Sequence, residues 1–341
     1  MTTDAPGSPG GGPEVFLTGA TGFVGRQVLN SLLAANYRVR ALIRDGSAPL
    51  QTRPGLTAVP GDVRRAGELV PSIEGCEYLI HVAALYSFSP AERSKLHAVN
   101  VLGTAGIIEA ARLAGVRRAV VTSSSATVGP ARGGRLATEE DWAVEGNGGS
   151  RYHRSKVEQE RVALAAQVPT VVLLPTAPMG PGDWKPTPTG KMLIDFLRGR
   201  IFASLGGGLN VVAVEDVAAA HVAALERGRP NERYLIGGEN VTLAELWSRL
   251  GEICGRRAPS RRIPYRLALA FGWGDEVRCR IAGYGGRNVA PLVPLEGVHM
   301  AQHRMWVDDR KARAELGHHP TSVTDALARA VAWYREHRYV E

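Results

Sequence analysis

Short apolar runs alternate with longer amphipathic stretches along the first half of the chain. Apolar runs bounded by turn residues are typical of buried strands, and apolar residues at helical spacing are typical of helices that cover a sheet. We expect helices over residues 24–33, 91–114 and 152–166. The expected strands cover residues 15–18, 38–43, 56–59, 77–82, 118–122 and 170–174.

This alternation predicts an α/β fold with a doubly wound parallel sheet, because βαβ crossovers place helices on both faces of such a sheet. Residues 14–175 are expected to form the sheet domain, with returning segments near 201–236. Residues 176–341 are expected to form a smaller, mostly α-helical region that is interleaved with it. The Gly- and Pro-rich residues 1–13 predict a disordered leader.

A glycine-rich turn joins the first predicted strand to the first predicted helix, with Gly19, Gly22 and Gly25 at regular spacing. One glycine in such a turn permits a positive φ, another lets a phosphate approach the backbone, and a third lets helix and strand pack closely. The helix that follows would direct its N-terminal amides at a pyrophosphate. The turn therefore predicts a dinucleotide site.

Composition narrows the class of protein. The 341 residues are 44% hydrophobic and 22% charged, as in a folded, soluble enzyme, and no apolar stretch is long enough to span a bilayer. Three cysteines without a CxxC pair indicate a reducing cytoplasm. The net charge of +8 comes from scattered arginines, so no nucleic-acid partner is expected. His299 and His303 have helical spacing but no third ligand, so no metal site is expected.

Ligands of parallel sheets bind at the carboxyl ends of the strands, which makes the residues after each strand candidates. Arg44 follows the second strand, where an acid would select NAD; an arginine suits the 2′-phosphate of NADP, although Asp45 stands beside it. Asp62 and Val63 follow the third strand, where a carboxylate could meet an adenine amino group. The fourth strand is followed by three small residues that a cofactor could pass: Val82, Ala83 and Ala84.

Tyr152 and Lys156 lie one helical turn apart, and serines follow the fifth strand. A nearby ammonium, together with a cationic nicotinamide, would stabilise a phenolate and lower the tyrosine pKa. A serine hydroxyl at the strand end could hold a substrate oxygen beside the phenol. This combination predicts proton transfer coupled to hydride transfer.

Together these motifs resemble the extended short-chain dehydrogenases/reductases of the NAD-dependent epimerase/dehydratase family, over nearly the whole chain after residue 13. Residues 173–190, 210–217, 226–240 and 311–317 resemble more specifically the hopanoid-associated sugar epimerase branch, often labelled dihydroflavonol-4-reductase-like. The motifs that carry the broader resemblance are TGATGFVG (18–25), GDV (61–63), HVAA (81–84), VNVLGT (99–104), TSSSATVG (122–129) and YHRSK (152–156).

The resemblance implies a Rossmann-type NAD(P)-binding domain and a catalytic set of Ser124, Tyr152, Lys156 and Asn100, with Ser125 as an alternative to Ser124. Two departures put a nucleotide-sugar substrate in doubt: Val128 and Arg44 replace the tyrosine and the acid that many epimerases carry. The implied cofactor contacts are Gly19, Thr21, Gly22, Phe23, Val24, Gly25, Arg44, Asp62, Val63, Val82, Ala83, Ala84, Asn100, Thr122, Ser123, Tyr152, Lys156, Pro175 and Thr176.

Tyr86, Phe88, Ser125 and Trp184 are the expected substrate contacts, because they stand in predicted loops near the reaction centre. An aromatic lining suits an apolar or aromatic carbonyl compound better than a pyrophosphate, which would want Arg or Lys. Three basic side chains further along could still meet a diphosphate: Lys185, Lys191 and Arg198.

Two enzymatic functions follow as hypotheses. The first is an NADPH-dependent reductase of a lipophilic or aromatic ketone, or the reverse dehydrogenase, with Tyr152 as acid/base. The second is an NAD-dependent nucleotide-sugar epimerase or dehydratase that retains its cofactor. A cofactor-sensing module without activity would not need the serine, tyrosine and lysine. The expected partner is a small carbonyl or hydroxyl compound, and a homodimer is expected by analogy with the family.

Overall fold

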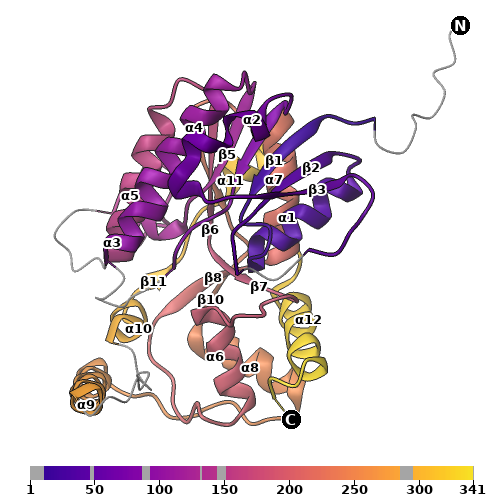
Figure 1. The fold of residues 1–341 in the computed structure, drawn as a ribbon. Helices are drawn as coiled ribbons and strands as arrows, with labels where there is room; N and C mark the ends of the chain where they lie inside the picture. The colour runs from indigo at the N-terminus through magenta and orange to yellow at the C-terminus, as the bar shows by residue number, and fades with distance from the viewer. Residues whose placement is uncertain are drawn as a thin grey trace, which may run out of the picture.

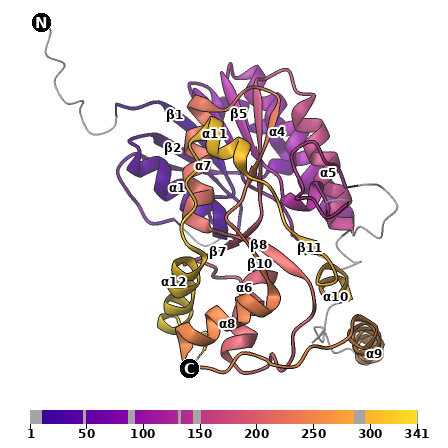
Figure 2. The ribbon, with the colours of Figure 1, turned by 180° about the vertical axis from the view of Figure 1, so that it is seen from behind.

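A seven-stranded parallel sheet with helices on both faces forms the centre of the molecule (Figures 1 and 2). The computed structural model describes residues 11–46, 50–86, 93–130, 133–143, 151–284 and 295–340. The strand order is β3-β2-β1-β4-β5-β6-β9, so the order reverses between β1 and β4. The strands are β1 (Glu14–Thr18), β2 (Arg38–Ile43), β3 (Leu56–Pro60), β4 (Tyr78–His81), β5 (Arg118–Thr122), β6 (Thr170–Pro175) and β9 (Glu232–Ile236).

Two helical layers cover this sheet. Each residue of β6 is buried, as expected of an apolar strand covered on both faces. One layer contains α1 (Phe23–Ala34), α7 (Val214–Arg227) and α11 (Arg310–Leu316), and α1 packs closely on α7. The other layer contains η1 (Val63–Leu69), α2 (Val70–Ile73), α3 (Arg93–Leu96), η3 (His97–Leu102), α4 (Gly103–Leu113) and α5 (Arg151–Leu164).

A second, smaller sheet joins the lower part of the molecule to the Rossmann sheet. Its centre is β8 (Gly208–Ala213), which pairs with three other strands. These are β7 (Ala177–Met179), β10 (Glu239–Thr242) and β11 (Arg304–Met305). Around it lie α6 (Pro188–Leu197), α8 (Leu243–Cys254), α10 (Leu295–Met300) and α12 (Val323–Glu336), and α9 (Tyr265–Tyr284) lies further out beside α10.

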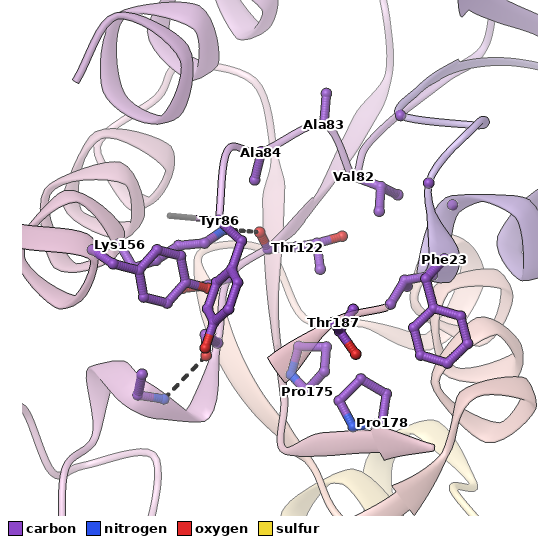
Figure 3. A pocket seen from close by; sticks show the side chains of 18 of the residues that line it. Phe23, Val82, Ala83, Ala84, Tyr86, Thr122, Lys156, Pro175, Pro178 and Thr187 are labelled. Carbon is purple, nitrogen blue, oxygen red and sulfur yellow. Dashed lines mark hydrogen bonds between the residues drawn. The ribbon is translucent and has the colours of Figure 1, made fainter. Parts of the chain in front are cut away.

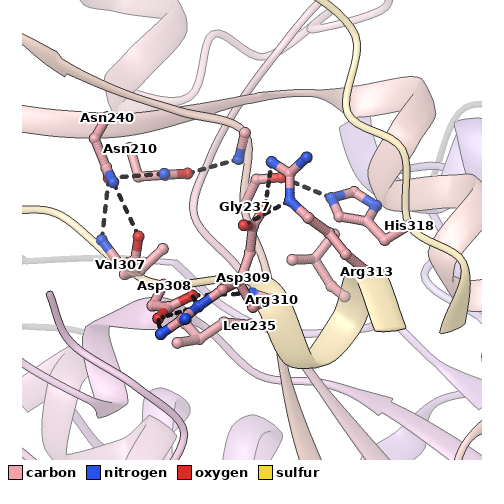
Figure 4. Close-up of polar contacts among 12 residues, drawn as sticks. Asn210, Leu235, Gly237, Asn240, Val307, Asp308, Asp309, Arg310, Arg313 and His318 are labelled. Atoms are coloured by element: carbon pink, nitrogen blue, oxygen red, sulfur yellow. Dashed lines mark hydrogen bonds and ion pairs between the residues drawn. The ribbon is translucent and has the colours of Figure 1, made fainter. Parts of the chain in front are cut away.

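Side-chain amides hold this second sheet in register (Figure 4). The side-chain amide of Asn240 bonds to the Val307 backbone as a neighbouring strand would. Its Oδ1 accepts from the Val307 amide (3.1 Å), and its Nδ2 donates to the Val307 carbonyl (2.9 Å). Asn210 Nδ2 donates to Asn240 Oδ1 (2.8 Å), while Asn210 Oδ1 accepts from the Gly238 amide (2.9 Å). The chain from β11 to α11 is thereby fixed beside β8 and β10.

The six predicted strands and the α/β fold class are confirmed, and β9 adds a seventh strand at the edge of the large sheet. The expected continuous helix over 91–114 is interrupted, because residues 97–102 form a π-helical turn, a feature frequent at functional sites. No helix in the described parts of the chain is long and apolar enough to cross a membrane. The prediction for residues 1–10 of the leader lies outside the described residues.

Candidate active site

A cavity of about 470 Å³ lies at the carboxyl ends of strands β1 to β6 (Figure 3). That volume is in the range of small-molecule and cofactor pockets. Nearly all the predicted site residues line it: Gly19, Thr21, Gly22, Phe23, Val24, Gly25, Arg44, Asp62, Val63, Val82, Ala83, Ala84, Tyr86, Thr122, Ser123, Ser124, Ser125, Tyr152, Lys156, Pro175 and Thr176. In Figure 3, Phe23 stands on one side of the cavity, and Lys156 and Tyr86 on the other.

The glycine-rich turn leaves room for a ligand at the start of α1. Gly19 has φ +79°, and a Cβ there would lie 2.6 Å from the Ala83 amide nitrogen. A Cβ at Gly25 would lie 2.0 Å from the Gly19 carbonyl oxygen, so this glycine is needed for the turn itself. At Gly22 the only close neighbour of a Cβ is that same oxygen, at 3.3 Å. Gly22 caps α1 without a side-chain hydrogen bond, which leaves the first-turn amides available to an anion.

Two charged side chains lie at the same end of the cavity. Asp62 Oδ2 accepts hydrogen bonds from Arg64 Nε (2.9 Å) and Nη2 (2.6 Å), and these bonds hold the pKa of the Asp62 carboxyl below its usual range. Arg44 is exposed and makes no ion pair with a carboxylate of the described residues. Its guanidinium is therefore available to an anionic group of a ligand.

Tyr152 and Lys156 are both buried and both line the cavity. Lys156 Nζ donates to the Thr122 carbonyl (3.1 Å) and to Gln159 Oε1 (2.8 Å), so two of its three hydrogens are used within the protein. Burial lowers the pKa of Lys156 to about 8, and the Glu160 carboxylate opposes this change. The remaining hydrogen is available to a ligand in the cavity.

Burial also raises the pKa of Tyr152, while a hydrogen bond with Ser124 acts in the opposite direction. This direction is the reverse of the lowering that the sequence suggested. The reason is that the Lys156 ammonium bonds to Thr122 and Gln159, and desolvation of the phenol dominates. In the protein alone, burial therefore favours the neutral form of the Tyr152 phenol.

A buried ion pair lies directly behind these two side chains. Glu160 is fully buried and forms an ion pair with Arg233 of β9. Its other oxygen accepts a hydrogen bond from Ser123 Oγ (2.7 Å). Arg233 in turn covers the Trp142 ring at 3.6 Å and donates to backbone carbonyls of residues 139–141. The sequence predicted none of this network, although Glu160 stands one helical turn after Lys156.

Two buried histidines form hydrogen bonds with threonines at the carboxyl ends of the strands. His221 Nδ1 donates to the Val217 carbonyl (2.7 Å), so its Nε2 accepts from the Thr122 hydroxyl (2.7 Å). His81 bonds to the hydroxyls of Thr18 (2.8 Å) and Thr104 (2.9 Å). Burial lowers the pKa of His221 to about 4 and that of His81 to about 3. Both rings are therefore neutral, and their hydrogen bonds hold Thr18 at the end of β1 and Thr122 at the end of β5 in place.

Asn100 does not line the cavity but holds the loop after β4. From the π turn, its Oδ1 accepts from the Leu85 amide (2.7 Å) and its Nδ2 donates to the Leu85 carbonyl (3.0 Å) and to Ser155 Oγ (3.1 Å). Ser155 belongs to the same helix as Tyr152 and donates to the Tyr152 carbonyl (2.8 Å). Asn100 therefore connects the loop with the active-site helix.

Of the four predicted substrate contacts, Tyr86 and Ser125 line the cavity. Tyr86 packs edge-on against the Tyr152 ring, with centroids 4.4 Å apart. Trp184 does not line the cavity, contrary to the prediction. Its ring packs instead against Trp333 of α12 and His337, which directly follows that helix. Phe88 lies outside the described residues. The lining residues that the sequence did not predict are Leu42, Gly61, Val99, Ala126, His153, Ala177, Pro178, Thr187, Pro188, Thr189, Leu209, Asn210 and Met305.

Comparison with known proteins places this site in a family. Residues 15–237 match the model of the NAD dependent epimerase/dehydratase family. A putative dihydroflavonol 4-reductase from Synechocystis sp. is 40% identical over 96% of each chain. Sterol demethylase protein B from Methylococcus capsulatus is 35% identical over 94% of this chain and 98% of its own. The solved structure of gox2253 has a TM-score of 0.83 and 33% identity, and the match covers 96% of this chain and 99% of that one.

The fold and the site define an enzyme that works with a nicotinamide dinucleotide. The chain belongs to the NAD-dependent epimerase/dehydratase family, that is, to the extended short-chain dehydrogenases/reductases. The cavity fits that cofactor on its own geometry: a glycine turn without Cβ atoms, uncapped amides at the start of α1, and a free donor on Lys156 at the opposite side.

Proposed function

We propose that this enzyme transfers hydride between a nicotinamide and the carbonyl or hydroxyl carbon of a lipophilic or aromatic substrate, with Tyr152 as the acid/base. The observation that carries the proposal is the placement of Tyr152, Lys156 and Ser124 in the same cavity as the glycine-rich turn. A bound dinucleotide would supply or accept the hydride.

The residues of the chain supply binding, orientation and the proton. The first turn of α1 and Gly22 would hold a pyrophosphate, and Lys156 would bond to the nicotinamide ribose with its free hydrogen. Ser124 would orient the substrate oxygen, and the Tyr152 hydroxyl would give its proton to that oxygen during reduction. Burial of Tyr152 and its packing against Tyr86 exclude water from this step.

The preferred cofactor in this proposal is NADP. Arg44 lines the cavity just after β2, beside Asp62, and its guanidinium is exposed. A guanidinium matches the geometry of a 2′-phosphate, whereas NAD offers a neutral ribose at that place. Arg44→Asp should weaken NADPH binding on the order of tenfold or more while leaving NADH nearly unchanged. Titration of both nucleotides by fluorescence tests this, and an unchanged ratio would contradict it.

The shortage of cations in the cavity lining supports a lipophilic substrate over a nucleotide sugar. The lining outside the cofactor motifs is mixed: Tyr86, Pro178, Leu209 and Met305 are apolar or aromatic, and His153, Thr187, Thr189 and Asn210 are polar but carry no fixed positive charge. Apart from Arg44 and Lys156, none of the described lining residues is an arginine or a lysine, so a substrate pyrophosphate would find no further cation. Lys185, Lys191 and Arg198 lie outside the cavity lining.

The test compares Tyr152→Phe with wild type in NADPH consumption over a panel of ketones, with nucleotide sugars assayed in parallel. The variant keeps the ring that packs on Tyr86 and loses only the hydroxyl. We expect kcat to fall by about 10²–10⁴ with little change in the NADPH dissociation constant. Full activity of Tyr152→Phe would refute the proton-transfer role. Turnover of sugar nucleotides with cofactor retained through purification would instead identify an epimerase.

We further propose a cytoplasmic homodimer. Leu102 and Leu113, from η3 and α4, are 58% and 59% exposed, which supports an interface along these helices. The cysteines Cys76, Cys254 and Cys279 are all unpaired, which supports a reducing compartment. Light scattering after size exclusion tests the dimer, and a monomer at micromolar concentration would contradict it.

A further inference from the structure

Helix α9 carries an apolar face that the described part of the chain leaves exposed. Leu267 and Phe271 lie four residues apart, as do Val277 and Ile281, so the two pairs project from one side of the helix with Arg278 among them. Trp273 lies at the edge of the same face. These five apolar side chains are between 47% and 67% exposed. Such a concentration of large apolar side chains on one exposed helix indicates an interaction surface.

The position of α9 leaves this face accessible. Both ribbon views show α9 at the edge of the molecule, beside α10 and away from the two sheets (Figures 1 and 2). On its inner side Ala268 is buried, and the Tyr265 hydroxyl bonds to His299 Nδ1 of α10 (2.7 Å). The inner side of the helix is thus used for packing, and the outer side is not.

A basic segment leads into the apolar face. Its five arginines are all exposed, and none pairs with a carboxylate of the described residues: Arg256, Arg257, Arg261, Arg262 and Arg266. Backbone hydrogen bonds join this segment to Ser204, whose amide donates to the Arg261 carbonyl (2.9 Å) and whose carbonyl accepts from the Ile263 amide (3.1 Å). Phe202, 77% exposed, stands two residues before Ser204 in the stretch of chain that pairs with this segment.

Residues 256–266 contain five arginines and no acid. Of the two acids of α9, Asp275 accepts a hydrogen bond from Arg278 of the same helix (2.8 Å), and Glu276 is half-buried. Face-to-face pairing of two copies would bring the arginine segments together without acids to neutralise them, which disfavours a second copy as the occupant. An anionic, apolar partner is complementary to both halves of the surface.

We propose that the face of α9, the arginine segment 256–266 and Phe202 dock onto an anionic lipid bilayer. Helix α9 then lies in the plane of the interface, with its apolar side chains among the acyl chains and the arginines at the headgroup phosphates. The 20 residues of α9 give a helix about 30 Å long, enough for a continuous line of contact. The enzyme would be a peripheral protein on the membrane surface.

Vesicle co-sedimentation of the full chain tests this, without cofactor or substrate, so that it is independent of the proposed function. The probes are phosphatidylcholine vesicles with and without phosphatidylglycerol. We expect binding only to the anionic vesicles, with loss of most binding for Phe271→Ser/Trp273→Ser. For Arg261→Gln/Arg262→Gln we expect weakening on the order of tenfold.

Two control variants make the outcome decisive. Arg335→Gln/Arg338→Gln removes the same charge from exposed positions at the far end of α12, and Leu136→Ser removes an exposed apolar side chain outside both proposed interfaces. Both should bind vesicles as wild type does. The proposal is overturned if wild type does not bind anionic vesicles, or if the controls lose binding as much as the α9 variants do. It is also overturned if the α9 substitutions leave vesicle binding intact and dissociate an oligomer instead.

Discussion

Replacing Glu160 by Gln removes one charge from the buried ion pair behind the catalytic residues while keeping the shape of the side chain. Arg233, 6% exposed, would keep its bonds to backbone carbonyls and its contact with Trp142 but would lose the carboxylate with which it pairs, leaving only the more distant Glu139 and Asp141. Removal of one partner of a buried pair costs about 3–5 kcal/mol. With an unfolding entropy of about 0.7 kcal/mol/K for 341 residues, that corresponds to a melting temperature lower by about 4–7 °C.

Calorimetry on three variants checks this reasoning. Glu109→Gln makes the same chemical change in the exposed pair with Arg112 and should melt close to wild type. Arg233→Met added to Glu160→Gln removes the orphaned charge and should restore much of the loss. If Glu160→Gln melted no lower than Glu109→Gln, the buried pair would not have the role assigned to it.

The same substitution should move a pH profile. The Glu160 carboxylate raises the pKa of Lys156 against the lowering by burial, which leaves it at about 8. Without that carboxylate the pKa falls further, so the ammonium is lost at lower pH as pH rises. The alkaline limb of kcat/KM should therefore shift to lower pH in Glu160→Gln and stay unchanged in Glu109→Gln, a result that a purely structural role would not produce.

Three further predictions concern the turn, the histidines and the loop after β4. Gly25→Ala would place a Cβ 2.0 Å from the Gly19 carbonyl oxygen and should weaken dinucleotide binding at least tenfold in calorimetric titration, whereas Gly67→Ala, with open space around it, should not. His81 and His221 stay neutral to about pH 3 and 4 when folded but take up protons below about pH 6.5 when unfolded. The free energy of unfolding should thus fall with decreasing pH below 6.5, by up to about 1.4 kcal/mol per pH unit for each histidine; a flat urea-denaturation series from pH 7 to 5 would contradict this. Asn100→Ala removes both hydrogen bonds to the half-buried Leu85 peptide groups and should lower the free energy of unfolding by about 1 kcal/mol in urea denaturation; an unchanged free energy would contradict the role given to Asn100.

The sequence predicted the large sheet and the cofactor side of the cavity because both depend on local patterns. Apolar runs mark strands that are buried on both faces, and the residues directly after them must meet at one edge of a parallel sheet. Gly22, Arg44 and Thr122 could therefore be assigned to one site from their positions in the chain, and all three line the cavity.

The substrate side could not be predicted in the same way. Leu209 and Met305 reach the cavity through β8 and β11, a pair far apart in sequence whose register depends on Asn240 and the Val307 backbone. The sequence predicts Trp184 in the cavity because it stands in a loop, but its ring packs against Trp333 of α12 instead. Side-chain partners that are distant in the chain, as for Glu160 and Arg233, leave no periodic signal.

The participation of β11 in the cavity has a consequence for biosynthesis. Met305 is translated long after Gly19, although both line the cavity. Before the ribosome has made β11, the glycine turn and the Tyr152 helix can already form, but the cavity lacks Met305. Completion of the seven-stranded sheet at β9 therefore comes before the cavity is complete.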